Sequence, residues 1–312
     1  MTTNLVHLLS REVGLPISDI EKIIASAPRR YKEFKILKKN GRGVRDIAQP
    51  SRELKALQRG VVSKIAPRLP VHDCVHGYVL GRGIKSNAQS HLGGSFILKM
   101  DLSDFFPSIK PVDLRHHLNK FLPGEFDEVE LRQLELILFW IKKGTSILRM
   151  CIGAPSSPLI SNTIMFDVDL EIDNLCRQYD VKYTRYADDL TFSCSEKGVL
   201  SLIQRGVSLI VRSSKSPIIK INEEKTLHLS KRAKMNVTGI NLTPDGSLSI
   251  GRERKRLIRV MAHHHSLGSL DAEGQNKLIG LLGFAFDIEP KFAMGVWGAL
   301  AGAPKLLRTE RK

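Results

Sequence analysis

Hydrophobic residues near the start of the chain recur with the spacing of helices. Residues 5–28 are predicted to form two helices, because segment 14–16 contains a glycine and a proline that interrupt the pattern. Ser18 and Glu21 lie three residues apart, which predicts a capping box at the start of the second helix. The same apolar spacing predicts further helices at 51–65, 111–122, 128–142, 158–178 and 198–213.

Strands are predicted where apolar, aromatic and β-branched residues form short runs. Residues 181–184 and 190–193 are such runs, and they flank the tetrapeptide Tyr186–Asp189, whose sequence is Tyr-Ala-Asp-Asp. Together these segments predict a hairpin with two carboxylates at its tip. A third run, 95–100, leads directly into another carboxylate, Asp101.

Turn residues predict two further hairpins. The strongly basic stretch 29–45 contains Asn-Gly at 40–41, a pair typical of a two-residue hairpin turn. Strand-like segments at 235–242 and 247–250 flank a Pro-Asp-Gly turn, and the chain beyond Arg252 is expected to be mostly helical. The order strand–helix–strand–strand–helix–strand around the aspartates predicts an α+β fold with a ferredoxin-like sheet.

Composition points to a polyanionic partner. The 312 residues include 48 Lys and Arg against 32 Asp and Glu, for a formal charge of +16 and a pI of about 9.8. Neutralising phosphates releases counterions, so nucleic acid fits this charge. An anionic membrane surface would exploit it too, but we expect no membrane partner, because the sequence has no spanning apolar run, signal peptide or lipidation motif.

The cysteines give an expectation about location. They are scattered along the chain and lack the spacing of metal ligands. We therefore expect reduced thiols in a cytoplasmic protein. They are Cys74, Cys151, Cys176 and Cys194.

Asp101, Asp188 and Asp189 are the candidate catalytic groups. Adjacent carboxylates at a turn repel one another and are commonly neutralised by a cation, although a solvated turn is the ordinary explanation of an Asp-Asp pair by itself. Three carboxylates on two neighbouring strands are what a two-metal phosphoryl-transfer site needs. Mg²⁺ is the expected ion, because it prefers carboxylate oxygen, water and phosphate as ligands.

The chain resembles reverse transcriptases, whose palm carries an Asp followed later by Tyr-Ala-Asp-Asp. Two further motifs narrow the resemblance to bacterial retron reverse transcriptases: Asn-Ala-x-x-His at 87–91 and Val-Thr-Gly at 237–239. The resemblance covers about residues 30–290. It implies a right hand with an N-terminal helical segment at 1–30, fingers at 31–95 with part of 107–155, a ferredoxin-like palm at 96–240 and a helical thumb at 241–312.

The resemblance implies roles at the catalytic site. It places two Mg²⁺ ions, with Mn²⁺ as a substitute, on Asp101, Leu102, Asp188 and Asp189. Lys225 belongs to the implied fourth palm motif and is a candidate general acid for the leaving pyrophosphate. Asp104 is expected to be structural, since it falls outside the positions that the family uses for metal.

Phosphate and sugar contacts are implied by two segments. Arg45, together with Lys38 or Lys39, is implied to bind the triphosphate, although a solvated basic face explains most charges in such a run. Phe106 is implied to pack under the incoming sugar and to clash with a ribose 2′-hydroxyl. The alternative for Phe106 is a place in a core aromatic pair with Phe105.

The loop 150–158 resembles the nucleotide-binding motif of the family. Ile152 stands where Gln is usual, and Cys151 stands where Pro is usual, so an apolar wall replaces a side-chain hydrogen bond to the sugar. Gly153 is expected to let the backbone approach the nucleotide or template closely. Tyr186 completes the implied nucleotide-binding set.

RNA contacts are implied by the two retron motifs and are predicted for one helix. The implied residues are Asn87, His91, Val237, Thr238 and Gly239. In the segment 252–261, basic side chains share a helix face that fits phosphate tracking, with a solvated face as the equally weighted alternative. These side chains are Arg252, Lys255, Arg256 and Arg259, whereas Leu257, Val260 and Met261 are expected to pack inward.

The resemblance implies an RNA-directed DNA polymerase whose partner is a cognate retron non-coding RNA. The implied product is branched msDNA, made from dNTPs by priming from an RNA 2′-hydroxyl. A separately encoded effector protein and a role in phage defence are also implied. Two alternatives remain: a nucleoprotein scaffold that holds RNA or msDNA to restrain an effector toxin, and a reverse transcriptase of another lineage, such as the group II intron type.

Overall fold

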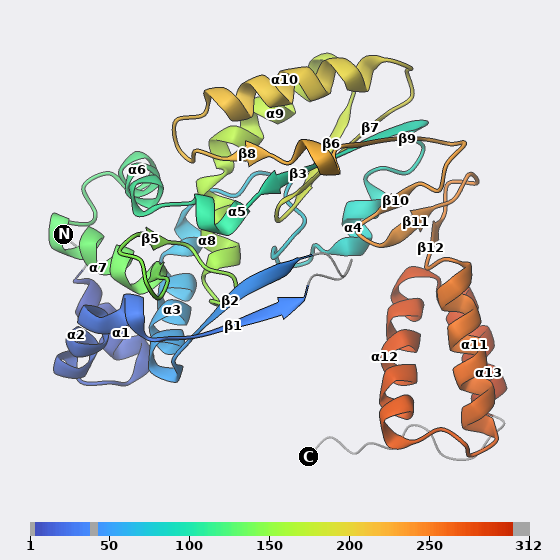
Figure 1. Ribbon diagram of the computed structural model, residues 1–312, viewed down its shortest axis with the longest axis horizontal. Coiled ribbons are helices and arrows are strands. Elements are labelled where there is room, and N and C mark those ends of the chain that lie inside the picture. The colour runs from blue at the N-terminus through green and yellow to red at the C-terminus, as the bar shows by residue number, and fades with distance from the viewer. Residues whose placement is uncertain (1–3, 38–42, 302–312) are drawn as a thin grey trace.

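A computed structural model describes residues 4–37 and 43–301 of the chain. Helices at the N-terminus lie on one side of a central sheet, and three C-terminal helices form a separate lobe on the other side (Figure 1). The sheet and its flanking helices share one large hydrophobic core, and the C-terminal lobe is built around a second.

The N-terminal segment contains the two predicted helices, α1 (Leu5–Val13) and α2 (Ile17–Ser26). Gly14 ends α1 in a left-handed conformation with φ 72°, which confirms the predicted break. The capping box predicted from Ser18 and Glu21 is wrong, because α2 already begins at Ile17. Pro16 occupies the N-cap position and has no side-chain acceptor, and its carbonyl oxygen accepts hydrogen bonds from the N–H groups of Asp19 and Ile20.

Strands β1 (Tyr31–Leu37) and β2 (Val44–Pro50) form an antiparallel pair whose last register position joins Leu37 to Val44. The predicted Asn-Gly turn at 40–41 lies outside the described residues. Helix α3 (Arg52–Lys64) follows and is capped by Ser51, whose Oγ accepts from the N–H of Leu54.

The central sheet has the strand order β6–β7–β3–β8, with β9 paired along another part of β3. All of these pairings are antiparallel. The order of the strands is that of a ferredoxin-like sheet. Helices α9 and α10 lie side by side on one face of the sheet (Figure 1). The strands are β3 (Phe96–Ser103), β6 (Lys182–Tyr186), β7 (Asp189–Cys194), β8 (Lys220–Ile221) and β9 (Leu227–Ser230).

Two long predicted helices are shorter in the structure. Helix α7 (Glu128–Leu138) stops before the aromatic pair Phe139-Trp140, and Trp140 enters the short strand β4 (Trp140–Ile141), which pairs with β5 (Leu148–Arg149). The predicted helix 158–178 divides near Met165 into α8 and α9. The remaining helices of this part are α4 (Ile84–Gln89), α5 (Phe105–Ser108), α6 (Pro111–Phe121), α8 (Ser157–Ile164), α9 (Phe166–Gln178) and α10 (Val199–Ser213).

The C-terminal region begins with a small sheet and continues as helices, as predicted. Its elements are β10 (Asn236–Val237), β11 (Ile240–Leu242), β12 (Leu248–Ser249), α11 (Arg252–Ser266), α12 (Ala272–Ile288) and α13 (Pro290–Ala301). Ile258 and Met261 of α11 are buried, whereas Leu257 and Val260 are 40% and 46% exposed. The prediction that Leu257 and Val260 pack inward is therefore wrong, because the buried face of α11 runs through Ile258 instead.

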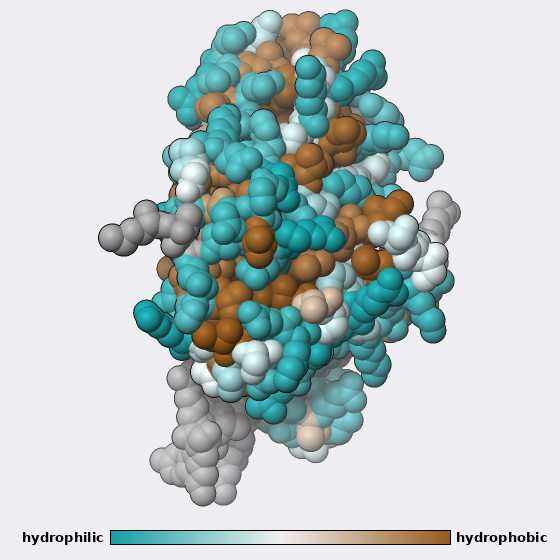
Figure 2. All heavy atoms as spheres, turned by 90° about the vertical axis from the view of Figure 1, so that its left-hand side faces the viewer, coloured by the Kyte–Doolittle hydropathy of each residue, from teal (hydrophilic) through white to brown (hydrophobic). Residues whose placement is uncertain are grey.

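The surface is mainly polar, with apolar side chains interspersed. Figure 2 shows the face on the side of the N-terminal helices, where hydrophobic side chains gather between hydrophilic ones. The four cysteines are buried and free of disulfides. Among residues 4–37 and 43–301, we find no helix with the length and apolar character that crossing a membrane requires.

Candidate active site

The tip of the β6–β7 hairpin carries the paired aspartates. Tyr186 pairs with Asp189, so Ala187 and Asp188 form a two-residue turn. Ala187 has φ 57°, a left-handed conformation that costs a non-glycine residue about 1–2 kcal/mol. Asp101 lies opposite Asp189 in the β3–β7 register. The antiparallel sheet therefore brings the three predicted aspartates to one edge.

A cavity of about 480 Å³ lies over this edge. Strand β2 contributes Arg45 to its wall, and the turn after the hairpin strand β6 contributes Asp188. Asp101, Phe106 and Lys225 also line the cavity. Positive and negative side chains thus face a common space large enough for a nucleotide-sized ligand.

Asp188 and Asp189, at the tip of the hairpin, have raised pKa values. Burial raises the pKa of Asp188, and the neighbouring Asp101 charge raises it further, while Lys225 and Arg45 oppose the shift. Burial also raises the pKa of Asp189 to about 6, with additional repulsion from Asp188 and Asp101. Carboxylates that repel one another in this way gain most from a nearby cation.

Lys225 supplies a positive charge at the edge. Its Nζ lies 2.8 Å from each carboxylate oxygen of Asp101. Within the described part of the chain, no three His, Cys, Asp or Glu side chains converge closely enough to hold an ion as they stand. The donor chemistry of the aspartates still suits Mg²⁺, and a metal bound there would draw the carboxylates together in place of the Asp101–Lys225 pair.

The structure separates the two aromatic residues after β3. Phe105 is 3% exposed and belongs to the core, whereas Phe106 is half-buried and lines the cavity. Their ring centroids are 5.2 Å apart. Phe106 is therefore placed to meet a ligand while resting on Phe105. Of the other predicted nucleotide contacts, Ile152 lines the cavity, and Lys38 and Lys39 lie outside the described residues.

Gly153 is required by a contact within the protein. It has φ 119°, and a Cβ at this position would lie 2.8 Å from the carbonyl oxygen of Ala48. The N–H of Ala48 also donates to the carbonyl oxygen of Ile152 at 2.9 Å. The close backbone approach expected here is thus an approach to β2, and a contact of Gly153 with nucleotide stays a prediction.

Tyr78 is a cavity residue that the sequence did not reveal. Its side chain is half exposed, lines the cavity and lies with its ring centroid 6.1 Å from that of Tyr186. Tyr78 has φ 61°, a strained conformation that is uncommon for a bulky residue and is concentrated at functional sites. In the sequence, only the adjacent Gly77 hints at this site, because it indicates an irregular segment. It does not predict the backbone conformation of Tyr78.

A family model described as reverse transcriptase (RNA-dependent DNA polymerase) matches residues 36–242, more than half of the chain. The chain belongs to this family. Two curated relatives from Escherichia coli narrow it to retron reverse transcriptases. The Retron Ec83 reverse transcriptase is 38% identical over 278 residues, with 88% of each chain covered. The Retron Ec73 reverse transcriptase is 33% identical over 282 residues, with 86% of each chain covered.

The relatives establish the activity of an RNA-directed DNA polymerase. A solved foamy viral protease-reverse transcriptase in complex with double-stranded DNA aligns with 90% of this chain and 45% of its own, at 15% identity and a TM-score of 0.46. That score is too low to carry an inference, so the family assignment rests on the sequence matches.

His91, from the Asn-Ala-x-x-His motif of this reverse transcriptase, lies inside the protein. Its side chain is 1% exposed; Nδ1 is 2.8 Å from Ser193 Oγ, and Nε2 is 2.7 Å from Thr184 Oγ1. Burial lowers the pKa of His91 to about 3, so the ring is neutral. The expectation of a direct RNA contact is therefore corrected, because the almost fully enclosed His91 ring joins the two strands that carry the catalytic turn.

The two retron motifs of the reverse transcriptase contact each other. Asn87 is 1% exposed, and its Nδ2 donates to Thr238 Oγ1 at 3.3 Å. Val237 is fully buried, and the carbonyl oxygen of Gly239 accepts from Arg254 Nη1 at 2.7 Å. The side chains of Asn87 and Val237 are thus also interior, which corrects their expected RNA contacts, whereas contacts by the half-buried Thr238 and Gly239 stay predictions.

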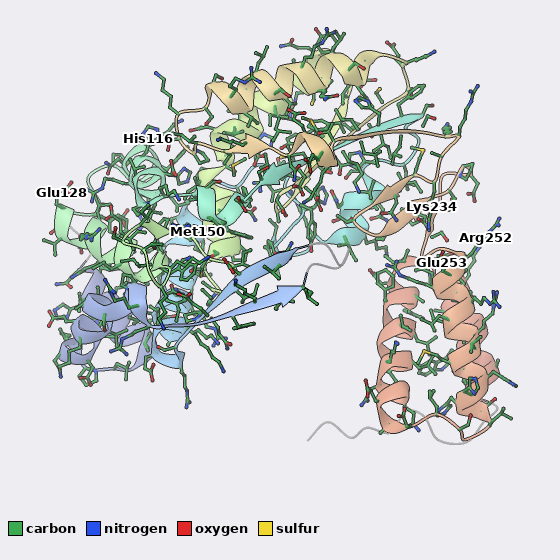
Figure 3. The ribbon with its side chains drawn as sticks, viewed as in Figure 1. His116, Glu128, Met150, Lys234, Arg252 and Glu253 are labelled. Carbon is green, nitrogen blue, oxygen red and sulfur yellow. The ribbon has the colours of Figure 1, made fainter. Side chains whose placement is uncertain are left out.

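The basic residues of α11 fall into two groups. Arg252 and Arg256 are exposed, and Figure 3 shows Arg252 at the start of the helix, beyond the small C-terminal sheet. Lys255 is half-buried and forms an ion pair with Glu289 at 2.5 Å, so its charge is already partnered. Arg259 is exposed, with its guanidinium 5.3 Å from the ring centroid of Phe292.

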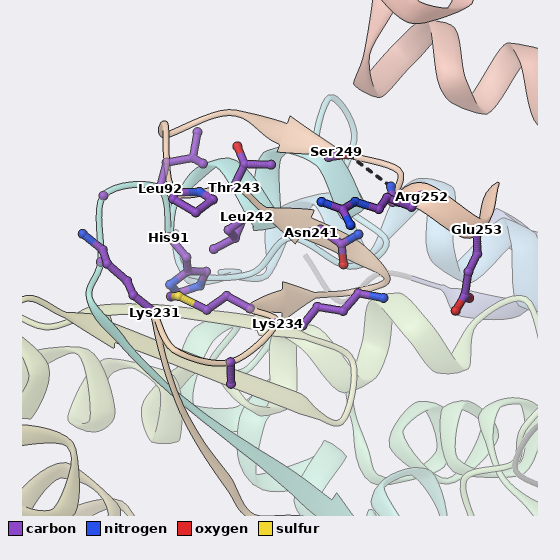
Figure 4. Close-up of a pocket in the computed structure, with 16 residues that line it drawn as sticks. His91, Leu92, Lys231, Lys234, Asn241, Leu242, Thr243, Ser249, Arg252 and Glu253 are labelled. Carbon is purple, nitrogen blue, oxygen red and sulfur yellow. Dashed lines mark hydrogen bonds between the residues drawn. The ribbon is translucent and has the colours of Figure 1, made fainter. Parts of the chain in front are cut away.

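A second cavity, of about 490 Å³, lies where α11 meets β11 and β12 (Figure 4). Lys231, Lys234 and Arg252 line it together with Glu253. Its three basic residues come from the segment between β9 and β10 and from the start of α11 in the reverse transcriptase.

Proposed function

We propose that this reverse transcriptase copies a partner retron RNA into branched msDNA, beginning at a 2′-hydroxyl of that RNA. The observation that carries the proposal is the sheet edge where Asp101 stands opposite Asp189 and beside the turn with Asp188, under a cavity that holds cationic side chains. Retron relatives at 38% and 33% identity support the retron RNA as the template.

Asp101, Asp188, Asp189 and the main chain of Leu102 would hold two Mg²⁺ ions, for which Mn²⁺ is a substitute. Bound there, the ions lower the pKa of the attacking hydroxyl and neutralise charge on the leaving pyrophosphate. Burial, with repulsion from neighbouring carboxylates, raises the pKa values of Asp188 and Asp189, and a cation bound beside them would stabilise their ionised forms.

The protein's own cationic groups bind and orient the nucleotide in this proposal. Arg45 enters the cavity from β2, and its fixed fork of donors suits a triphosphate. Lys225 stands beside Asp101 and donates a proton to the pyrophosphate as it leaves. Phe106 rests on the buried Phe105 and blocks a ribose 2′-hydroxyl, so deoxynucleotides are selected.

We assign the subdomains of a right hand on the same basis. The segment 1–30 is helical, 31–95 forms fingers with part of 107–155, 96–240 forms the palm and 241–312 forms the thumb. A separately encoded effector protein and a role in phage defence, both implied by the family resemblance, are part of this proposal. A cytoplasmic location fits the free, buried cysteines.

The decisive experiment supplies the purified protein with its cognate retron RNA, Mg²⁺ and dNTPs. The expected product is DNA joined to RNA through a 2′,5′ linkage, and replacing the nucleotide that carries the priming 2′-hydroxyl with its 2′-deoxy form should abolish it. Competition with an unrelated structured RNA of equal length at about 0.15 M salt tests recognition, because general charge attraction is weakened there. Equal affinity for the two RNAs would refute the retron RNA as the specific partner.

A further inference from the structure

A buried charged cluster lies beneath the catalytic turn. Arg185 is the residue of β6 just before Tyr186, and both Arg185 and its partner Asp169 on α9 are completely buried. Arg185 Nε donates to Asp169 Oδ1 at 2.8 Å, and Nη2 donates to Oδ2 at 2.7 Å. A buried ion pair is weak evidence for stability, because apolar residues of the same volume often serve as well. Its position at the hairpin indicates another role.

The remaining guanidinium nitrogen of Arg185 connects the cluster to the turn. Nη1 donates to the carbonyl oxygen of Ala187 at 3.2 Å and to Asn162 Oδ1 at 3.0 Å. Ala187 is the turn residue with φ 57°, directly before Asp188. The guanidinium therefore fixes the peptide unit that leads into the metal-binding aspartates.

Asn162, on α8, joins this cluster to the segment around Gly77 that packs against the turn. Its Nδ2 donates to the carbonyl oxygen of Gly77 at 2.8 Å. Gly77 lies so close to the hairpin that a Cβ there would be 3.0 Å from the backbone nitrogen of Ala187. The preceding backbone pairs with β6, because Arg185 N–H donates to the Cys74 carbonyl and His76 N–H donates to the Arg185 carbonyl, each at 2.8 Å.

We propose that Arg185, Asn162 and Gly77 form a clamp that positions the catalytic turn for DNA synthesis. Arg185 holds the Ala187 carbonyl, Gly77 packs against the backbone of the turn, and Asn162 connects the two. Asp169 orients Arg185 and also accepts a hydrogen bond from Tyr183 at 2.9 Å. The clamp touches no substrate, and it acts by setting the direction of the Asp188 and Asp189 carboxylates. This proposal rests on the proposed metal-binding role of those aspartates.

The first test replaces Asn162 with Ala, which leaves the Arg185–Asp169 pair intact. With a primed RNA template, Asn162→Ala should lower kcat about 10–100-fold, the size of effect that a small misplacement of catalytic groups produces. Its KM for dNTP and its RNA affinity should stay within about twofold of wild type, since uniform binding is not removed. The Mg²⁺ concentration for half-maximal rate should rise.

Thr163→Val is the matched control. Thr163 follows Asn162 on α8, is also fully buried, and donates its hydroxyl to the Ile160 carbonyl within the same helix at 2.9 Å. The control removes a buried hydrogen bond that does not involve the turn, so kcat and the Mg²⁺ requirement should stay at wild-type values.

Gly77→Ala tests the clamp without removing any hydrogen bond, and it carries the test if Asn162→Ala fails to fold. The added methyl must displace the Ala187 backbone, so kcat should again fall at unchanged RNA affinity. Wild-type kcat in folded Gly77→Ala, or an equal loss in Thr163→Val, would overturn the clamp. Asp188→Asn distinguishes the two proposals: if it is inactive while both clamp variants are fully active, only the clamp is refuted, whereas activity in Asp188→Asn refutes the metal-binding role itself.

Discussion

The catalytic hairpin and the C-terminal helices use arginine in opposite ways. Arg185 beneath the hairpin has no exposed surface and is bonded to Asp169, Asn162 and the Ala187 carbonyl. Arg252 and Arg256 on α11 are exposed. A buried guanidinium must be fully partnered because its desolvation is costly, so it fixes geometry, whereas an exposed one remains available for phosphate. We therefore propose that buried charge positions the catalytic turn, whereas exposed charge contributes affinity for RNA.

Neutralising the aspartates should produce the largest effect. Asp188→Asn or Asp101→Asn should lower Mg²⁺-dependent dNTP incorporation by roughly 10³-fold or more, because the carboxylates would hold the ions that stabilise both reacting oxygens. Thermal unfolding of Asp188→Asn should show no loss of stability, since its ionised form is already disfavoured by burial. A wild-type rate in either variant would contradict the site assignment.

Phe106 should control the choice of sugar. Phe106→Val opens space in the cavity, so we expect the ratio of rNTP to dNTP efficiency to rise about 10–100-fold, as relief of a single steric clash allows. Phe105→Leu is the control: Phe105 is buried, so this change should lower stability and leave the ratio unchanged. An unchanged ratio in Phe106→Val would assign Phe106 to packing alone.

The exposed arginines of α11 should govern affinity and its salt dependence. Arg252→Gln and Arg256→Gln should weaken binding of every RNA and reduce the slope of log affinity against log salt by roughly 0.7–0.9 for each phosphate that the variant no longer neutralises. Lys255→Gln should leave that slope unchanged, because Lys255 is partnered by Glu289. Equal slopes for all three variants would remove the distinction between partnered and free charges on this helix.

The sequence predicts the hairpin at 186–189 and its facing Asp101 because strand composition and turn position are local properties. It also locates Phe106, Ile152 and Lys225, which resemble short family motifs and do line the cavity. The ends of the helix 128–142 and the inward face of α11 depend on packing partners far along the chain, so local patterns misplace them. The reason for a glycine at 153 is also a distant contact, because a side chain there would collide with the backbone of β2.

The orientation of side chains within the retron motifs could not be predicted from the sequence either. A motif identifies positions that belong together, but not whether their side chains face RNA or one another. Asn87 and Thr238 are 151 positions apart and hydrogen-bonded. The clamp residues Asn162 and Gly77 had no motif to mark them, because their contact with the hairpin exists only in the fold.

The last prediction concerns the buried ring of His91 and the pH dependence of the free energy of unfolding. Burial holds its pKa at about 3 in the folded protein, against an ordinary value of 6.5. Between these values the unfolded chain binds a proton that the folded chain does not, so the stability from the neutral, buried ring is complete above pH 6.5 and is lost as pH falls toward 3. Relative to pH 7, this linkage should lower the free energy of unfolding at pH 5 by about 2 kcal/mol.

Urea unfolding of wild type and His91→Gln at both pH values measures the His91 contribution as a difference, because all other titratable groups remain in both proteins. His91→Gln should be less stable at pH 7 and should lose less stability on acidification than wild type. Its folded form should bind the cognate RNA with wild-type affinity at pH 7. Selective loss of that affinity with no change in the pH response would return His91 to the RNA interface.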